Sequence, residues 1–456
     1  MEPIKLHPEN NRYFSFRGKP TVLITSAEHY GAVINPDFDF IRYLNELQAK
    51  GLNKTRIFTG QFIERADDIP SPGAHNTLCP ADGRFLAPWA RSAVPGYARG
   101  GNKFDLDVWD RRYFDRLAEF VTEAGKRDIV VEVCLFCNIY KDSQWDDCPM
   151  KSDNNVNGVG TVEAARVLTT DNGNLLACQK RMVRKFVTEL KDFDNVYYEI
   201  VNEPYHDYGA TESFENHIIA TIASTEAAFP CRHLIAVNVA NFWSTVTKPN
   251  PNVSIYNFHY AYPPDAIAMN ESLNKAIAYD ESGFQGTADL PYRTGAWDFI
   301  VAGGAVFDHL DFSFAVSCEE GTLAVAPDAP GGGGEAIRRQ MSILKRFIDG
   351  FDFVRMAPDD GVIAGKIPDG VTVRALAERG EQYAIYVNGN ALDRISLNLS
   401  VGSYTVQWVD TKTGAYPKEQ TIKHSGGNFV LEVPSYTDDI ALSVKRRREL
   451  SSDSNP

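Results

Sequence analysis

Short apolar segments alternate with longer amphipathic segments along the first 350 or so residues. The apolar segments are rich in β-branched and aromatic residues, which is typical of strands, whereas the amphipathic segments carry the single apolar stripe of a helix packed on a sheet. The predicted strands are 21–26, 53–58, 129–136, 196–201, 234–239, 253–258, 276–279 and 304–314, and the predicted helices are 37–50, 111–127, 172–192, 213–229 and 335–349. Eight strands interleaved with helices predict an α/β fold, a (β/α)8 TIM barrel. A short hairpin over 13–20, with Arg17-Gly18 in its turn, is predicted to cap the floor of this barrel.

The pattern changes near Met356, where hydrophobic residues begin to alternate with polar ones at period 2. The segments 371–376, 382–387, 395–399, 404–409 and 429–433 show this alternation, and glycine turns separate them. The pattern predicts a small antiparallel β-sandwich after the barrel. We therefore expect a barrel domain over 1–355, a sandwich domain over 356–446 that packs on the barrel, and a disordered tail over 447–456.

Composition and charge limit the partners. The formal net charge of −14 argues against nucleic acid or an anionic membrane surface as a partner. The seven cysteines are an odd number, and Cys134 and Cys137 lie inside an apolar strand, so buried thiols are favoured over a zinc or redox site. No long apolar run is present, which predicts a cytoplasmic protein, or a periplasmic or secreted one if a signal peptide has been removed.

Two glutamates follow predicted strands in matching positions. Strand 196–201 runs into Asn202-Glu203-Pro204, where proline ends strand pairing, and strand 276–279 runs into Asp280-Glu281. The two glutamates are 78 residues apart (281 − 203), which fits three βα units of ordinary length. The carboxyl ends of barrel strands form the catalytic rim, so both carboxylates are expected there, after the fourth and seventh strands.

These two motifs, over roughly residues 10–350, resemble the clan A retaining glycoside hydrolases, which have cellulase-like, family 5-like barrels. The resemblance implies that Glu203 is the general acid/base and Glu281 the nucleophile. It also implies that Asn202 bonds the sugar 2-hydroxyl, that Arg56 lies beside the nucleophile, and that His259 or Tyr260 hydrogen-bonds it. The tryptophan that family 5 members carry after the eighth strand is missing here.

Further substrate contacts are predicted at the rim. Glu28, His29 and Tyr30 follow the first strand, and Trp243 follows the fifth. Two long inserted segments, 61–107 and 138–169, are expected to cover the site as loops. They carry Trp89 and Trp145, which either stack on sugar rings or hold the segments down.

The predicted function is hydrolysis of β-glycosidic bonds in a glucan or a related plant, algal or microbial oligo- or polysaccharide, by double displacement. One alternative is a non-catalytic carbohydrate-binding barrel. Another is a metal-dependent hydrolase, but His206 and Asp207 have no third partner at ligand spacing, so neither a metal nor a cofactor is expected. The expected partner is a carbohydrate substrate, and oligomeric state is left open.

Overall fold

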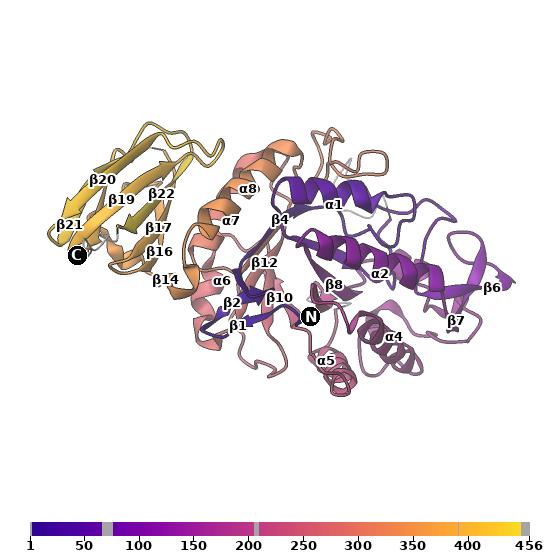
Figure 1. Cartoon of the computed structure of the whole chain (residues 1–456). Helices are drawn as coiled ribbons and strands as arrows, with labels where there is room; N and C mark the ends of the chain where they lie inside the picture. Colours follow the sequence, from indigo (N-terminus) through magenta and orange to yellow (C-terminus); the bar gives the residue numbers. More distant parts are fainter. Residues whose placement is uncertain (1, 66–75, 205–208, 391, 448–456) are drawn as a thin grey trace, which may run out of the picture.

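Eight parallel strands form the predicted barrel, and helices surround it (Figure 1). The structure is a computed structural model that describes residues 2–65, 76–204, 209–390 and 392–447. The barrel strands are β4 (Leu23–Ala27), β5 (Lys54–Phe58), β8 (Val130–Cys137), β9 (Val196–Asn202), β10 (Ile235–Asn241), β11 (Ile255–His259), β12 (Ala276–Ser282) and β13 (Val306–Leu310). The predicted fold class, a TIM barrel followed by a β-sandwich, is confirmed.

One side chain joins the first two strands of the barrel. The hydrogen-bonded order is β4-β13-β12-β11-β10-β9-β8-β5, so β4 and β5 end the ladder. Asn53 connects them, because its Oδ1 accepts the Ile24 N–H at 2.9 Å and its Nδ2 donates to the Val22 carbonyl at 2.9 Å. The barrel is therefore nearly closed, and the carboxyl ends of its strands share one rim.

Helices cover the outside of the barrel. They are α1 (Phe40–Ala49), α2 (Arg111–Lys126), α4 (Leu175–Leu190), α5 (Glu212–Glu226), α6 (Asp265–Met269), α7 (Asp289–Val301) and α8 (Glu335–Asp349), and α3 (Asp142–Asp147) lies in an inserted segment. Single 3-10 turns occur at Ser152–Asn154, Ala164–Arg166, Glu271–Leu273, Phe353–Arg355 and Asp360–Val362. All five predicted helices are present. Helix α7 was not predicted. Every residue from Tyr292 to Val301 is buried, so its sequence has no apolar stripe set against a polar face.

A three-stranded antiparallel sheet precedes the barrel: β1 (Lys5–His7), β2 (Asn10–Phe16) and β3 (Lys19–Thr21). Its predicted turn at Arg17-Gly18 is present, and Arg17 adopts a left-handed backbone with φ of 50°. The Arg17 side chain donates to both oxygens of Asp194 at 2.8 Å, next to the start of β9. This ion pair ties the hairpin to the amino-terminal end of the barrel, as expected.

The segment 61–107 was predicted as a loop without regular structure, and that prediction is wrong. Strands β6 (Trp89–Pro95) and β7 (Asn102–Trp109) pair there as an antiparallel hairpin. Three of the glycines that suggested a loop, Gly96, Gly100 and Gly101, lie in the turn of this hairpin instead.

The carboxyl-terminal region contains two packed antiparallel sheets. One has the order β14-β16-β17-β22-β19-β20 and the other β15-β18-β21. Their strands are Ala357–Pro358 (β14), Ile363–Ala364 (β15), Thr372–Glu378 (β16), Gln382–Asn388 (β17), Arg394–Leu399 (β18), Gly402–Val409 (β19), Lys418–His424 (β20), Gly427–Glu432 (β21) and Asp439–Arg446 (β22). The five predicted strands are present. Strand β22 was not predicted, yet it pairs with both β17 and β19.

The sandwich packs against α7 and α8 of the barrel (Figure 1). Arg293 of α7 donates to Asp439 of β22 at 2.7 and 3.0 Å, and both side chains are buried. Beside this pair, the Trp297 ring stacks on Tyr386 with centroids 5.6 Å apart. These contacts support the predicted packing role. The domain limits at 355/356 and 446 stay a proposal, and the predicted disordered tail lies outside the described residues except for Arg447.

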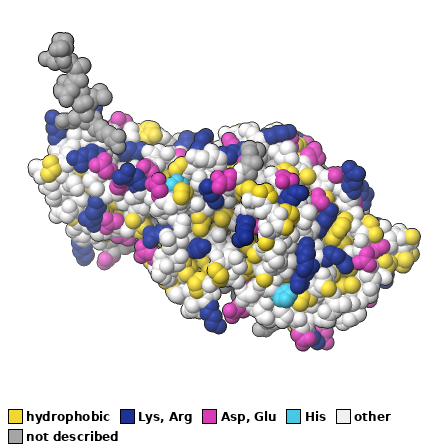
Figure 2. Space-filling view, turned by 60° about the horizontal axis from the view of Figure 1, so that its bottom comes forward, with side chains coloured by type: hydrophobic (Ala, Val, Ile, Leu, Met, Phe, Trp, Pro, Cys, Tyr) yellow, Lys and Arg dark blue, Asp and Glu magenta, His cyan; other side chains and the backbone are white. Residues whose placement is uncertain are grey.

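Surface charge is mixed on the face that Figure 2 presents, where basic and acidic side chains are interspersed over both parts of the molecule. Among the described residues, no helix combines the length and the apolar character needed to span a bilayer.

Asp439→Ala tests the interface between barrel and sandwich. The substitution removes the closest counter-charge of the buried Arg293 guanidinium and leaves only the more exposed Asp438, 3.8 Å away, so the free energy of unfolding should fall by about 3 kcal/mol. The matched control is Asp359→Ala, which breaks a more exposed pair with Arg379 and should cost about 1 kcal/mol or less. Urea unfolding monitored by circular dichroism measures both, and equal losses would contradict the assigned role of the buried pair.

Candidate active site

Glu203 and Glu281 meet at the carboxyl-end rim of the barrel. Glu203 directly follows β9, and Glu281 lies near the end of β12, which continues through Ser282. One carboxylate oxygen of each lies within 4.8 Å of the other. Glu281 is buried, whereas the Glu203 side chain keeps 13% of its surface exposed. The structure thus brings the two predicted carboxylates together, one enclosed and one reached by solvent.

Three donors hold the Glu281 carboxylate. Tyr260 Oη donates to Oε1 at 2.8 Å, Tyr30 Oη donates to Oε2 at 3.0 Å, and Arg56 Nη1 lies 3.3 Å from Oε2. Hydrogen bonds and a positive charge both favour the ionised form of a carboxyl group. Arg56 and Tyr260 were predicted here. Tyr30 was expected only as a possible sugar contact.

Arg56 lies at the centre of the buried site, with no exposed surface. Its guanidinium donates from Nε to Glu199 Oε2 at 2.9 Å and from Nη2 to Asn202 Oδ1 at 2.7 Å, and it also pairs with Glu281. The guanidinium also lies over the Tyr30 ring, 4.7 Å from its centroid. Arg56 therefore fixes Asn202 and Glu281 at once.

Glu203 has a separate set of partners. Tyr140 Oη donates to Glu203 Oε2 at 2.7 Å, and His259 Nδ1 lies 3.0 Å from Glu203 Oε1. Asn202 Nδ2 donates to the Tyr140 oxygen at 2.9 Å. Tyr140 comes from the inserted segment after β8, and its motif-free surroundings offered no signal of this role. The two carboxylates are therefore held by different groups, with His259 near both.

His259 is fully buried between the carboxylates. Burial alone would lower its pKa, but the negative charges of Glu281 and Glu203 outweigh burial and raise the pKa to about 9. The Nδ1 atom of His259 lies 3.7 Å from Glu281 Oε1 as well as 3.0 Å from Glu203. The prediction named His259 as a partner of the nucleophile, but its shorter contact is with Glu203.

A layer of charged side chains lies beneath the rim, inside the barrel. Lys54 Nζ lies 2.8 Å from Glu132 Oε2 and 2.8 Å from Asp308 Oδ2. Although burial opposes it, the charges of Lys54 and Arg56 lower the pKa of Glu132. Burial raises the pKa of Asp308 to about 6 against the effect of Lys54. These groups lie on three strands that are far apart in the sequence, β5, β8 and β13, so this layer was not predicted.

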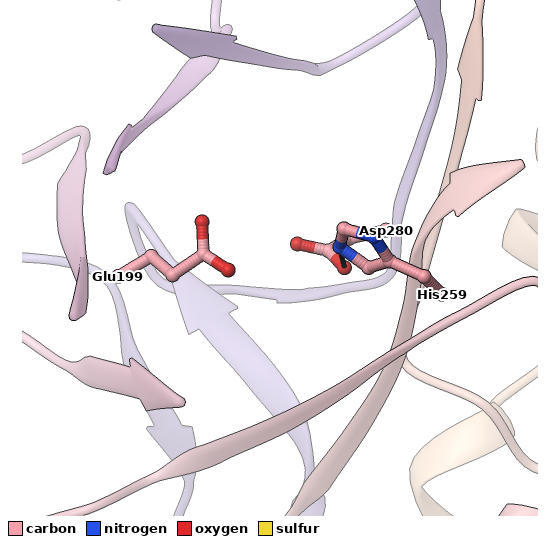
Figure 3. A group of neighbouring side chains, drawn as sticks. All are labelled: Glu199, His259 and Asp280. Atoms are coloured by element: carbon pink, nitrogen blue, oxygen red, sulfur yellow. Dashed lines mark ion pairs between the residues drawn. The ribbon is translucent and has the colours of Figure 1, made fainter. Parts of the chain in front are cut away.

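Glu199, His259 and Asp280 point toward one another within that layer (Figure 3). Asn257 Nδ2 donates to Glu199 Oε1 at 2.9 Å and to Asp280 Oδ2 at 2.8 Å. Oxygen and nitrogen atoms of this trio lie within 4.8 Å of one another, as do those of Glu203, His259 and Glu281. Amide, guanidinium and phenol donors of the protein already bond these carboxylates, so the arrangement is that of a hydrogen-bonded network. The residues His206 and Asp207, considered as metal ligands, lie outside the described part of the chain.

Two of the substrate contacts predicted after the first strand, Glu28 and His29, differ in their surroundings. Glu28 is fully buried and accepts the backbone N–H groups of Gly31 and Ala32 at 2.8 and 3.2 Å, so it shapes its own loop and is not a substrate contact. Burial raises the pKa of Glu28 to about 8, against these two hydrogen bonds. His29 Nε2 lies 2.6 Å from Glu64 Oε2, and its role in substrate binding stays a prediction.

The predicted aromatic contacts also divide into two groups. Trp89 is fully buried, and its ring stacks on the Trp109 ring with centroids 6.3 Å apart. Trp145 is buried too, and its Nε1 donates to the Val162 carbonyl at 2.9 Å. Of the two predicted roles, this burial favours holding the inserted segments down, and a role of either ring in substrate binding stays a prediction. Trp243 is 42% exposed and stays a candidate for sugar binding.

Comparison with known families gives one match. Residues 90–294 match the family model Cellulase (glycosyl hydrolase family 5). No curated protein sequence matches the chain.

Solved structures share the fold. A structure described as a glycoside hydrolase is 14% identical with a TM-score of 0.67, covering 98% of this chain and 97% of its own. A family 5 glycoside hydrolase from Bacteroides vulgatus is 12% identical with a TM-score of 0.67 and coverages of 97% and 93%. An endo-1,4-β-mannanase from Rhizomucor miehei is 13% identical with a TM-score of 0.52, covering 77% of this chain and all of its own. The match to the family model supports a glycoside hydrolase with a cellulase-like barrel, and the solved structures show that the fold is shared.

Trp145→Ala and Trp243→Ala test the division between buried and exposed tryptophans. Removing the buried Trp145 ring opens a cavity and should lower the free energy of unfolding by about 3–5 kcal/mol. Removing the exposed Trp243 ring should change it by less than about 0.5 kcal/mol. Urea unfolding followed by circular dichroism compares the two variants. A stable Trp145→Ala protein would instead favour the predicted role of this ring in substrate binding.

Proposed function

We propose that this cellulase-like barrel is a retaining glycoside hydrolase that cleaves β-glycosidic bonds in a glucan or a related plant, algal or microbial oligo- or polysaccharide. The supporting observation is the approach of Glu203 and Glu281, because one carboxylate oxygen of each lies within 4.8 Å of the other. Retaining enzymes hold their two carboxyl groups about 5–5.5 Å apart, whereas inverting enzymes leave about 6.5–9.5 Å for a water molecule. An approach of single oxygens to within 4.8 Å leaves less room for an intervening water than the inverting spacing does, which supports double displacement.

In the first step, Glu281 attacks the anomeric carbon and the bond to the leaving oxygen breaks. Arg56, Tyr30 and Tyr260 hold the Glu281 carboxylate in place. Glu203 gives its proton to the departing oxygen, so the leaving group departs as a neutral alcohol.

In the second step, Glu203, now a carboxylate, takes a proton from a water molecule that attacks the same carbon. The bond between that carbon and Glu281 breaks, and the sugar leaves with its original configuration. The Nδ1 atom of His259 and the Tyr140 hydroxyl lie at the two oxygens of Glu203, where they stabilise the carboxylate between the steps.

Substrate recognition is assigned to the Asn202 amide and to two exposed aromatic rings that follow β10. The Asn202 amide is oriented by Arg56 and Tyr140, so it is preorganised to bond the sugar 2-hydroxyl. Trp243 and its neighbour Phe242 are 42% and 52% exposed, and their rings suit the C–H faces of a pyranose. Because one of the similar structures is an endo-1,4-β-mannanase, β-mannans join β-glucans and aryl β-glycosides in the substrate screen.

Glu203→Ala and Glu281→Ala test the catalytic assignment. Each variant should lose roughly 10²- to 10⁴-fold or more in kcat on unactivated substrates, because each lacks a group that acts in the transition state. Added azide should rescue both, giving a glycosyl azide of inverted configuration from Glu281→Ala and of retained configuration from Glu203→Ala. Product NMR reads the configuration.

Glu189→Ala is the matched control, since Glu189 lies on α4 and pairs with Lys185 away from the rim. It should hydrolyse substrate at the rate of the unmodified protein. Full turnover by either catalytic variant would contradict the proposal, and sugar binding without hydrolysis across the whole screen would favour a carbohydrate-binding barrel.

A further inference from the structure

Two buried polar atoms face each other beneath the acid/base without a hydrogen-bond partner. They are His259 Nε2 and Asp280 Oδ1, and both side chains are fully buried. The two atoms lie 3.5 Å apart. Figure 3 shows the two side chains next to each other. Unpaired buried polar atoms are costly, and one proton between these two atoms would satisfy both.

The second polar atom of each side chain already has a partner. His259 Nδ1 lies 3.0 Å from Glu203 Oε1, so the imidazole spans the space between Asp280 and Glu203. Asp280 Oδ2 accepts a hydrogen bond from Asn257 at 2.8 Å. The groups form a line from the barrel interior to the rim: Asn257, Asp280, His259 and Glu203.

We propose that Asp280 is a positioning residue for the general acid/base, and that it acts on Glu203 through His259. This inference rests on the proposed function. Glu203 is itself protonated before the first step, so only Glu281 bears a charge beside the ring. With the shared proton on Asp280 Oδ1, Nε2 of a neutral His259 accepts from Asp280 and the ring hydrogen is on Nδ1. The imidazole then donates to Glu203 Oε1 throughout the reaction.

The consequence for Glu203 is that its two carboxyl oxygens have different roles. With Oε1 accepting from His259, the proton that is transferred to the leaving group resides on Oε2, beside the Tyr140 hydroxyl. After that transfer, the same Nδ1–H bond stabilises the carboxylate until it accepts a proton from water. The Asp280–His259 pair gains and loses no proton in the cycle.

The charges around Asp280 agree with a proton being kept there. Burial raises the pKa of Asp280 well above its ordinary value, and Glu132 and Glu199 add to that effect while Arg56 and His259 oppose it. These four groups come from four other strands of the barrel, β8, β9, β5 and β11.

The geometry distinguishes two substitutions at position 280. Asn257 donates to the oxygen on one side, so an asparagine at 280 would turn its oxygen toward Asn257 and its NH2 toward His259 Nε2. That NH2 donates just as a protonated Asp280 does. Asp280→Asn should therefore keep the hydrogen on Nδ1, whereas Asp280→Ala removes the partner altogether.

The test measures kcat/KM on aryl β-glycosides with good and poor leaving groups. Asp280→Ala should lose roughly 10- to 100-fold on poor leaving groups, which need the acid, and less than about 3-fold on a dinitrophenyl glycoside, which does not. Asp280→Asn should restore most of the loss. The control is Asp308→Ala, which removes a buried carboxylate that pairs with Lys54 and should not change the ratio between the substrates.

Two further measurements test the inference even if the Asp280→Ala variant folds poorly. Nitrogen-15 NMR of the unmodified protein should show His259 protonated at Nδ1, with the signal assigned by its loss in His259→Gln. The double variant His259→Gln/Asp280→Asn should be no worse than His259→Gln alone, because Asp280 acts through the ring.

A His259 ring with an unprotonated Nδ1, or an equal loss on all leaving groups, would overturn the inference. If Glu203→Ala and Glu281→Ala also kept full turnover, the proposed function itself would fail. If those two variants were inactive, only the role of Asp280 would fall.

Discussion

The arrangement of this site depends on one buried positive charge, the guanidinium of Arg56. A charge in the barrel interior is costly unless opposite charges and hydrogen bonds surround it. Glu199 supplies the closest counter-charge, and Glu281 and Asn202 take the remaining donors. Because these three partners come from β9 and β12, the need to neutralise one arginine fixes groups from separate strands relative to one another.

The second constraint is backbone geometry at the rim. Glu203, Tyr260 and Tyr30 have φ angles of 50°, 53° and 56°, in the left-handed region that side chains rarely adopt. Such conformations persist where the surrounding structure determines them, and they cluster at functional sites. Here the three residues are one carboxylate and the two phenols that bond the other. The barrel frame thus holds the reacting groups at the point where its strands end.

Much of this structure was predictable because it follows local rules. Strand and helix periodicity gave all eight barrel strands and five helices, and the spacing of Glu203 and Glu281 placed both on one rim. The charged layer was not predictable, because Lys54, Glu199 and Asp280 become neighbours only when distant strands close into a barrel. Tyr140 was missed for the same reason, since it reaches Glu203 from an inserted segment. Trp89 and Trp145 show the converse, because composition does not reveal which face of a loop an aromatic ring takes.

The central claim is that Glu281 forms a covalent bond to the sugar while Glu203 alternates between acid and base. Incubation with a 2-deoxy-2-fluoro β-glycoside bearing a good leaving group tests it most directly, because the fluorine slows release of the intermediate more than its formation. Mass spectrometry of the intact protein and its peptides should show one sugar attached, on Glu281. A label on another residue, or no label together with products of inverted configuration, would contradict the account.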